Sequence, residues 1–188
     1  MRAVPAPVIS VLHDTPGVRA QLVSLLTGTV AQGGSVGFMH PLSPAVADAF
    51  WAGSLAAAAR DERTVLGAWA GDTLIGTVTL LLALPPNQLH RAEIAKMMTR
   101  PQWRGQGVAR ALLRRAEALA VERGRTLLVL DTATEGGAAG LYEKAGYTRA
   151  GEIPDFALKP HGGLTGTLLY WKRIGPAATS AAPEDASE

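Results

Sequence analysis

The sequence predicts an α/β fold, a single three-layer αβα sandwich around a mixed, largely antiparallel sheet. Three observations predict it. Segments rich in β-forming residues alternate with segments of helical periodicity in the order β, α, α, β, β, β, α, β, α, β, β. Several neighbouring strands are joined by short turns, which favours antiparallel pairing. With 188 residues, 47% of them hydrophobic, the chain can bury one sizeable core.

The N-terminal third predicts one strand and two helices. Residues 8–12 form a short β-branched run, and a Thr-Pro pair then opens a helix over residues 15–30, where apolar side chains recur at helical spacing. A Ser-Pro pair opens a second helix over residues 43–60. Between the helices, residues 32–41 carry three glycines and a proline, which indicates an irregular loop.

The middle of the chain predicts a hairpin and a third strand. Residues 64–70 and 73–83 are rich in β-formers and are separated by Gly71-Asp72, a two-residue hairpin turn. Residues 91–99 form the next strand, which ends before a proline.

The C-terminal half alternates helices and strands. A helical stripe begins at Val108 and ends at Gly124, and an apolar run over residues 126–130 is typical of a central strand. A short helix over residues 138–145 and strands over 147–153 and 165–174 complete the domain, which we place at residues 1–174. Residues 175–188 are mainly Ala, Ser, Pro and acidic residues and predict a disordered tail.

Composition excludes several classes of protein. With no cysteine, the chain has no disulfide scaffold, no thiolate metal site and no cysteine nucleophile, and we expect no metal. No apolar run approaches the ~18 residues of a spanning helix. We therefore expect a cytoplasmic protein that does not bind membranes.

Basic residues are concentrated in one segment, although the net charge is only +2. This excess predicts an anionic ligand or a solvated helix face. A nucleic-acid-binding module is the alternative, but it would interleave aromatic side chains for stacking, and Trp103 is the only one in the segment. The basic residues are Arg91, Lys96, Arg100, Arg104, Arg110, Arg114, Arg115, Arg123 and Arg125.

A glycine-rich stretch joins the predicted strand over residues 91–99 to the predicted helix that begins at Val108. A helix N-terminus offers unpaired amides and a positive dipole end, and glycines at 105 and 107 allow a close approach of backbone to a phosphate. The alternative is a tight strand-to-helix turn with no ligand. A dinucleotide-binding fingerprint is disfavoured because its third glycine would fall at Arg110.

The sequence resembles a known family at two blocks. Arg104-x-x-Gly107-x-Ala109 is similar to the acetyl-coenzyme A motif of the GNAT superfamily of N-acetyltransferases, and residues 141–147 resemble that family's second block. The resemblance is closest to the tabtoxin-resistance type, through residues 33–39, 91–93, 130–132 and 147–154. It implies an α/β fold, acetyl-coenzyme A (acetyl-CoA) as cofactor and an amine as acceptor.

The resemblance also implies where the cofactor lies. Its pantetheine would run along the strand before the glycines, where a backbone amide is our candidate donor to the developing oxyanion. Its pyrophosphate would lie on the start of the following helix. The implied cofactor-binding residues are Met97, Met98, Thr99, Arg104, Gly105, Gln106, Gly107, Val108, Ala109 and Arg110.

Three side chains are candidates for proton transfer. Attack of an amine on a thioester needs an acid for the leaving thiolate and a base for the ammonium proton. The family pattern makes Tyr142 the acid, although a core aromatic is the alternative. Glu93 and Asp131, at strand positions, are the candidate bases; the alternatives are a salt bridge from Glu93 to Arg91 or Lys96, and a loop cap for Asp131.

Two irregular segments are the candidate walls of the acceptor pocket. Residues 33–41 and 154–164 mix glycine with aromatic residues and histidine, which suits closure over a small ligand. His40 and His161 are weaker candidates for a base. The candidate acceptor contacts are Val36, Phe38, Met39 and Phe156.

The sequence therefore predicts an acetyl-CoA-dependent N-acetyltransferase that acts on a small amine, amino-acid-like or antibiotic-like, by direct transfer. A catalytically silent acetyl-CoA sensor is the next interpretation, and a nucleic-acid binder the third. We expect a monomer or homodimer with no nucleic-acid partner.

Overall fold

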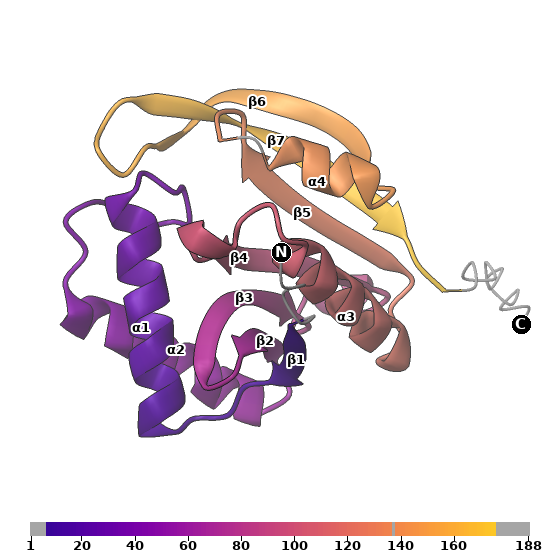
Figure 1. The fold of residues 1–188 in the computed structure, drawn as a ribbon. Helices are drawn as coiled ribbons and strands as arrows, with labels where there is room; N and C mark the ends of the chain where they lie inside the picture. The colour runs from indigo at the N-terminus through magenta and orange to yellow at the C-terminus, as the bar shows by residue number, and fades with distance from the viewer. Residues whose placement is uncertain (1–6, 137, 176–188) are drawn as a thin grey trace, which may run out of the picture.

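A computed structural model describes residues 7–136 and 138–175 of the chain. It contains a seven-stranded sheet in the order β1-β2-β3-β4-β5-β7-β6 (Figure 1). In chain order the elements are β1 (Val8–Val11), α1 (Pro16–Ala31), α2 (Pro44–Ala59), β2 (Arg63–Ala70), β3 (Thr73–Leu81), η1 (Pro86–Gln88), β4 (Arg91–Thr99), η2 (Pro101–Trp103), α3 (Val108–Glu122), β5 (Leu127–Ala133), α4 (Ala139–Lys144), β6 (Thr148–Leu158) and β7 (Leu164–Arg173).

The sheet is antiparallel except at its centre. Strands β1 to β4 pair in chain order with antiparallel neighbours, β4 and β5 pair in parallel, and β5, β7 and β6 are again antiparallel. Helices α1 and α2 pack on one face, while α3 and α4 pack on the other (Figure 1). The predicted three-layer fold with a mixed sheet is confirmed.

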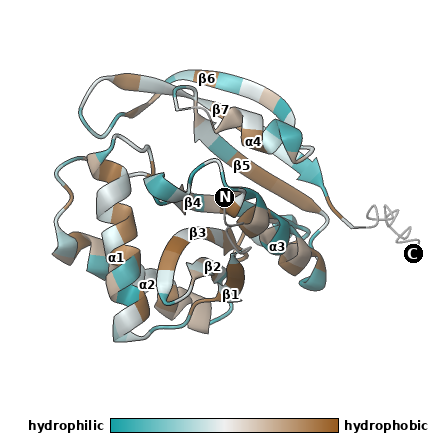
Figure 2. Cartoon of the chain, viewed as in Figure 1, coloured by the Kyte–Doolittle hydropathy of each residue, from teal (hydrophilic) through white to brown (hydrophobic). Residues whose placement is uncertain are grey.

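Each face of the sheet buries its own core. The α3 and α4 side packs leucines of α3 against the alternating inward residues of β2 to β5, and the apolar run along β5 is clear in Figure 2. The α1 and α2 side is built around Trp51 and the leucines of α1. Both helices begin as expected: Thr15 and Ser43 accept hydrogen bonds from backbone amides in the first turn.

Strand β6 differs from the sequence prediction. It continues to Leu158, so the expectation of irregular chain from residue 154 is wrong over residues 154–158. Pro154 cannot donate a ladder hydrogen bond, which disfavours a proline in the interior of a strand. The strand instead accommodates the proline in an irregular stretch between Ile153 and Ala157, where Asp155 has φ +52°. Residues 176–188 of the predicted tail lie outside the described residues.

Strands β4 and β5 part after three rungs of their ladder. The last pair is Glu93 with Val129, and beyond it the two strands diverge (Figure 1). On its other side β4 carries a bulge, since Ala95 faces Thr79 whereas Met98 faces Thr77. A bulge bends its strand and increases its twist, and it accompanies the separation of β4 from β5.

A glycine on β3 lets the start of α3 approach this region. A Cβ added at Gly76 would lie 2.9 Å from the carbonyl oxygen of Met98 and 3.0 Å from Cγ1 of Val108. Both distances are shorter than van der Waals contact allows. Gly76 therefore sets how closely α3 packs on the β3 and β4 strands.

Gly76→Ala is expected to destabilise the fold by about 1–3 kcal/mol, because the methyl group overpacks this contact. Thermal or urea unfolding would measure the loss. Gly53→Ala is the matched control, since nothing lies within 4 Å of its added Cβ and alanine favours the α2 helix. A Gly76→Ala protein as stable as the wild type would contradict the prediction.

Candidate active site

The glycine loop, residues 104–109, forms an open cradle at the start of α3. Gly105 and Gly107 have φ values of +73° and +82°, and nothing lies within 4 Å of a Cβ added to either. Gly107 is the N-cap of α3, and no side chain caps the helix there. The backbone amides in the first turn of α3 therefore have no side-chain cap, and the space next to the two glycines is open.

Two side chains of this loop bond to backbone carbonyls of β4 and η2. Nε2 of Gln106 donates to the carbonyl oxygen of Gln102 at 2.7 Å, and Nε of Arg104 lies 3.4 Å from the carbonyl oxygen of Thr99. Together with the positive end of α3, the arginine gives the loop the charge and donors that fit a pyrophosphate.

A basic hollow of about 240 Å³ lies between α3 and α4. Arg110, Arg114 and Lys144 line it, and none of the ion pairs between described residues includes them. Glu117 also lines the hollow, but Lys172 neutralises it at 2.8 Å. The hollow therefore carries an excess of positive charge beside the glycine loop.

Other basic residues of the segment 91–125 have partners of their own. Five of them donate hydrogen bonds to carboxylates or to backbone carbonyls, so they do not form an unpaired basic stripe. The pairs are Arg91 with Glu93, Arg100 with Leu74, Arg115 with Glu122, Arg123 with Asp61, and Arg125 with Leu89.

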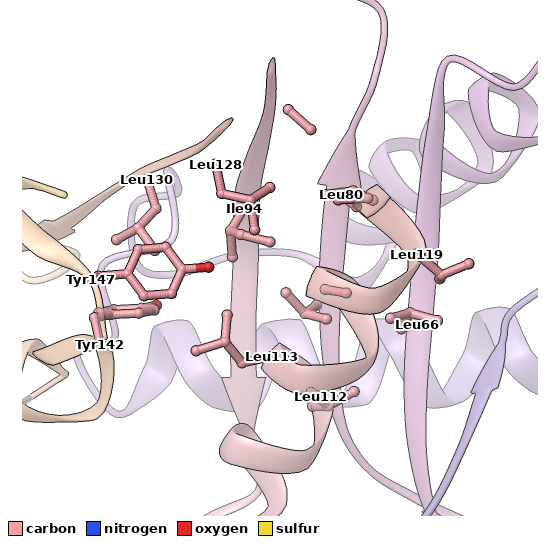
Figure 3. Close-up of a cluster of buried hydrophobic side chains, with 14 of the residues drawn as sticks. Leu66, Leu80, Ile94, Leu112, Leu113, Leu119, Leu128, Leu130, Tyr142 and Tyr147 are labelled. Carbon is pink, nitrogen blue, oxygen red and sulfur yellow. The ribbon is translucent and has the colours of Figure 1, made fainter. Parts of the chain in front are cut away.

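Tyr142 of α4 lies in the core on the α3 and α4 side of the sheet. It is 5% exposed, and its ring packs edge-on against Tyr147 at 5.9 Å between centroids (Figure 3). Burial raises the pKa of Tyr142 to about 12, and the negative charge of Asp131 adds to the rise. The phenol is therefore protonated at neutral pH, the form that a proton donor requires.

Tyr147 is a buried neighbour of a different kind. Burial raises the pKa of its phenol, and the Glu117 carboxylate near the hydroxyl raises it further. The ring of Tyr147 also receives the ammonium of Lys172 at 5.4 Å. Its surroundings are those of a packing residue.

The two carboxylates lie in different settings. Glu93 belongs to the last rung of the β4 and β5 ladder, and Oε1 accepts a hydrogen bond from Nη1 of Arg91 at 2.5 Å. Asp131 lies two residues beyond that rung, is exposed, and accepts a hydrogen bond from Thr167 at 2.9 Å. The salt bridge considered for Glu93 is present, whereas Asp131 stands where the strands have parted.

The methionines before the glycine loop occupy both faces of β4. Met97 packs on the α3 side and Met98 in the core on the α1 side. Met98 pairs with Thr77 of β3, so the opposite edge of β4 faces the separation from β5. Oγ1 of Thr99 is buried with no partner among the described residues. This edge carries backbone groups that no strand of the sheet uses.

The two predicted walls of the acceptor site meet in space. The amide of His40 donates to the carbonyl oxygen of Pro160 at 2.9 Å, and the rings of His40 and His161 lie 4.4 Å apart. Nε2 of His161 also lies 3.1 Å from the carbonyl oxygen of Ala31. The loop after α1 is thereby joined to the turn between β6 and β7.

The four predicted acceptor contacts do not lie together: two pack in the core and two are exposed. Val36 and Phe38 pack against the core under α1 and α2, and Phe38 meets Phe50 edge-on at 5.1 Å. Met39 is 46% exposed, and Phe156 on β6 is 54% exposed. The structure thus brings Phe38 to α2 but leaves Phe156 on the surface of an edge strand.

Lys96 lies near Phe50 in the same part of the fold as Phe38, and the sequence patterns do not mark it as a site residue. It lies at the β4 bulge with φ +52°, and its Nζ is 5.8 Å from the ring centre of Phe50. A Cβ added at Gly37 would lie 3.3 Å from this nitrogen. Burial lowers the pKa of Lys96, with Asp131 acting in the opposite direction. A lone lysine within the apolar run 94–98 was the available signal.

Comparison with known proteins identifies the family. The model of the acetyltransferase (GNAT) family matches residues 36–147, which is more than half of the chain. The chain belongs to the GNAT acetyltransferase family. The matched region of this GNAT protein contains the glycine loop, both candidate bases and Tyr142.

Individual relatives agree with this assignment. This GNAT protein is 34% identical over 85 residues to N-acetyltransferase 8B of Rattus norvegicus, a match over 44% of this chain and 38% of the relative's length. Its fold is similar to ribosomal-protein-alanine N-acetyltransferase of Brucella melitensis (TM-score 0.75, 20% identity, 88% of this chain and 99% of the other). It is also similar to an aminoglycoside 6'-N-acetyltransferase complexed with coenzyme A (TM-score 0.70, 17% identity, 90% and 98%).

The GNAT protein spans well under half the length of the curated relative that it matches. Within residues 7–136 and 138–175, no helix combines the length and apolar character needed to cross a membrane.

Proposed function

We propose that this protein is an N-acetyltransferase that moves the acetyl group of acetyl-CoA directly to the amine of a small molecule. The observation that carries the proposal is the separation of β4 and β5 next to the glycine loop, with Tyr142 and Asp131 near the separation. Membership of the GNAT family and similarity to a coenzyme A complex support it.

The residues present fit acetyl-CoA. The open glycine loop and the uncapped start of α3 would hold its pyrophosphate, and Arg104 would add charge. The hollow lined by Arg110 and Arg114 offers cations for a further phosphate. The edge of β4 that does not pair with β5 would hold the pantetheine through backbone groups from Met97 to Thr99.

The cofactor would supply an acetyl group activated as a thioester, so that transfer forms an amide C–N bond, breaks the C–S bond and leaves a thiol. Tyr142 would hold the proton that the sulfur needs, since its burial keeps the phenol protonated. A β4 amide would donate to the carbonyl oxygen as negative charge develops there.

Asp131 is our proposed base for the ammonium proton of the acceptor. Its carboxylate is exposed beyond the last rung of the ladder, and its hydrogen bond from Thr167 holds it in place. Glu93 is the alternative base, but its ion pair with Arg91 competes for the same lone pairs. The loop 33–41 and the turn before β7, which a hydrogen bond from His40 to Pro160 joins, would form a wall of the acceptor site.

The finer resemblance to the tabtoxin-resistance type supports an amino-acid-like or antibiotic-like acceptor.

Calorimetric titration with acetyl-CoA, with NAD and a short DNA duplex as controls, tests the cofactor. Micromolar binding of acetyl-CoA alone, about −8 kcal/mol, is expected. Release of thiol with a panel of amines then tests transfer. Binding without release by any amine would favour a silent sensor, and binding of a control instead would contradict the assignment.

Gly107→Ala is expected to weaken acetyl-CoA binding by about tenfold or more, because a methyl group would occupy the anion's approach. Titration calorimetry measures the change. Gly124→Ala is a matched control at the other end of α3: it has φ +70° and nothing within 4 Å of an added Cβ. The two variants share the backbone strain, so equal affinities would contradict the prediction.

A further inference from the structure

The ammonium of Lys96 is covered by two other segments of the fold and has no anionic partner among the described residues. Phe50 of α2 covers it at 5.8 Å, and Gly37 of the loop lies against it. None of the ion pairs between described residues includes Lys96. A half-buried cation loses hydration, and that loss is offset when an anion binds it.

Backbone geometry holds Lys96 in this position. Lys96 and Met97 both lie opposite Val78 at the bulge, and Lys96 adopts a left-handed φ of +52°, which a residue with a side chain adopts at a cost. The contact with Phe50 shows that the bulge directs the lysine to the α1 and α2 side. The same separation of strands that would admit the acceptor therefore has a cation on its β4 side.

An anion stands on the β5 side of the separation. Asp131 is exposed two residues beyond the last rung of the β4 and β5 ladder, where its negative charge opposes the lowering of the Lys96 pKa and raises the pKa of Tyr142. A ligand placed between the strands would thus meet positive charge on one side and negative charge on the other.

We infer that the acceptor is a zwitterion, an amine that carries a carboxylate, with Lys96 binding the carboxylate and Asp131 facing the amine. This inference rests on the proposed function and names its substrate class. A single ammonium beside an aromatic ring suits one carboxylate, whereas a phosphate dianion would need several donors. Lys96 is then a specificity-determining residue, and its replacement changes which amines are accepted more than it changes acetyl transfer.

The test compares L-amino acids with their carboxamides, which differ only in the carboxylate. Wild type, Lys96→Met and Lys96→Arg are assayed by thiol release at fixed pH and salt. Methionine has a side chain of similar length and must adopt the same left-handed φ, whereas arginine keeps the positive charge. Because the carboxamide amine is the weaker base, the quantity measured is the ratio of kcat/KM for acid over carboxamide, compared between variants.

The ratio is expected to fall about 10- to 100-fold in Lys96→Met, mainly through KM for the acid, and to be largely retained in Lys96→Arg. An unchanged ratio in Lys96→Met overturns the inference. The inference is also overturned if the wild type acetylates amines without a carboxylate and leaves the amino acids unmodified. That result would leave the proposed acetyltransferase function intact. Failure of every amine to release thiol from bound acetyl-CoA would contradict the proposed function as well.

Discussion

Replacement of Tyr142 by phenylalanine is expected to lower kcat by about 100-fold or more, with little change in acetyl-CoA affinity. The phenol is 5% exposed and its raised pKa, about 12, keeps the proton in place at any pH suited to an assay. Phenylalanine preserves the ring contacts with Tyr147 and Tyr170. The variant thus removes a proton donor without creating a cavity.

Tyr147→Phe is the control for this experiment. The two rings touch and both phenols are buried, but the Tyr147 hydroxyl approaches Glu117 and lies in a packing environment. Its removal is expected to leave turnover unchanged, because the hydroxyl interacts with Glu117, which has no part in the proposed transfer. Steady-state kinetics and thermal unfolding of both variants give the comparison. Wild-type turnover by Tyr142→Phe would remove its role as the acid.

The elements that could be predicted from sequence are those with a local physical cause. Gly71 and Asp72 form the hairpin between β2 and β3, and the Thr-Pro and Ser-Pro pairs start α1 and α2. Gly107 precedes α3 because only a residue without a Cβ readily adopts φ +82°. Each of these features is set within a few residues of chain.

Features that arise from contacts between distant segments could not be predicted in this way. The close approach of α3 that requires Gly76 depends on Met98 and Val108, which lie more than twenty residues away. The continuation of β6 through Pro154 depends on pairing with β7. Local rules therefore predicted a break in the chain where tertiary pairing maintains the strand.

The candidate site shows the same division. The glycine loop could be predicted as an anion site because Gly105 and Gly107 are only one residue apart in sequence, whereas the surroundings of Lys96 come from Gly37 and Phe50 on two other segments. The bulge that directs Lys96 is a property of the pairing between β3 and β4. Charge counting placed Lys96 among nine basic residues but could not show which of them lack partners.

Asp131→Asn is expected to lower kcat/KM for the amine by about 100-fold or more at neutral pH, since the ammonium proton loses its acceptor. Asparagine preserves the size of the side chain and can keep the hydrogen bond from Thr167 through its amide oxygen. The protein should therefore remain folded, and binding of acetyl-CoA should be unchanged by calorimetry.

The pH dependence distinguishes loss of a base from loss of a substrate contact. As pH rises toward the pKa of the acceptor amine, more of the amine is already neutral, so the deficit in kcat of Asp131→Asn should shrink; loss of a contact that only binds the acceptor would instead raise KM and leave kcat unchanged. Glu93→Gln, which breaks the ion pair with Arg91, is the comparison. If Glu93→Gln gave the larger, pH-dependent loss, Glu93 would be the base and Asp131 a contact to the amine.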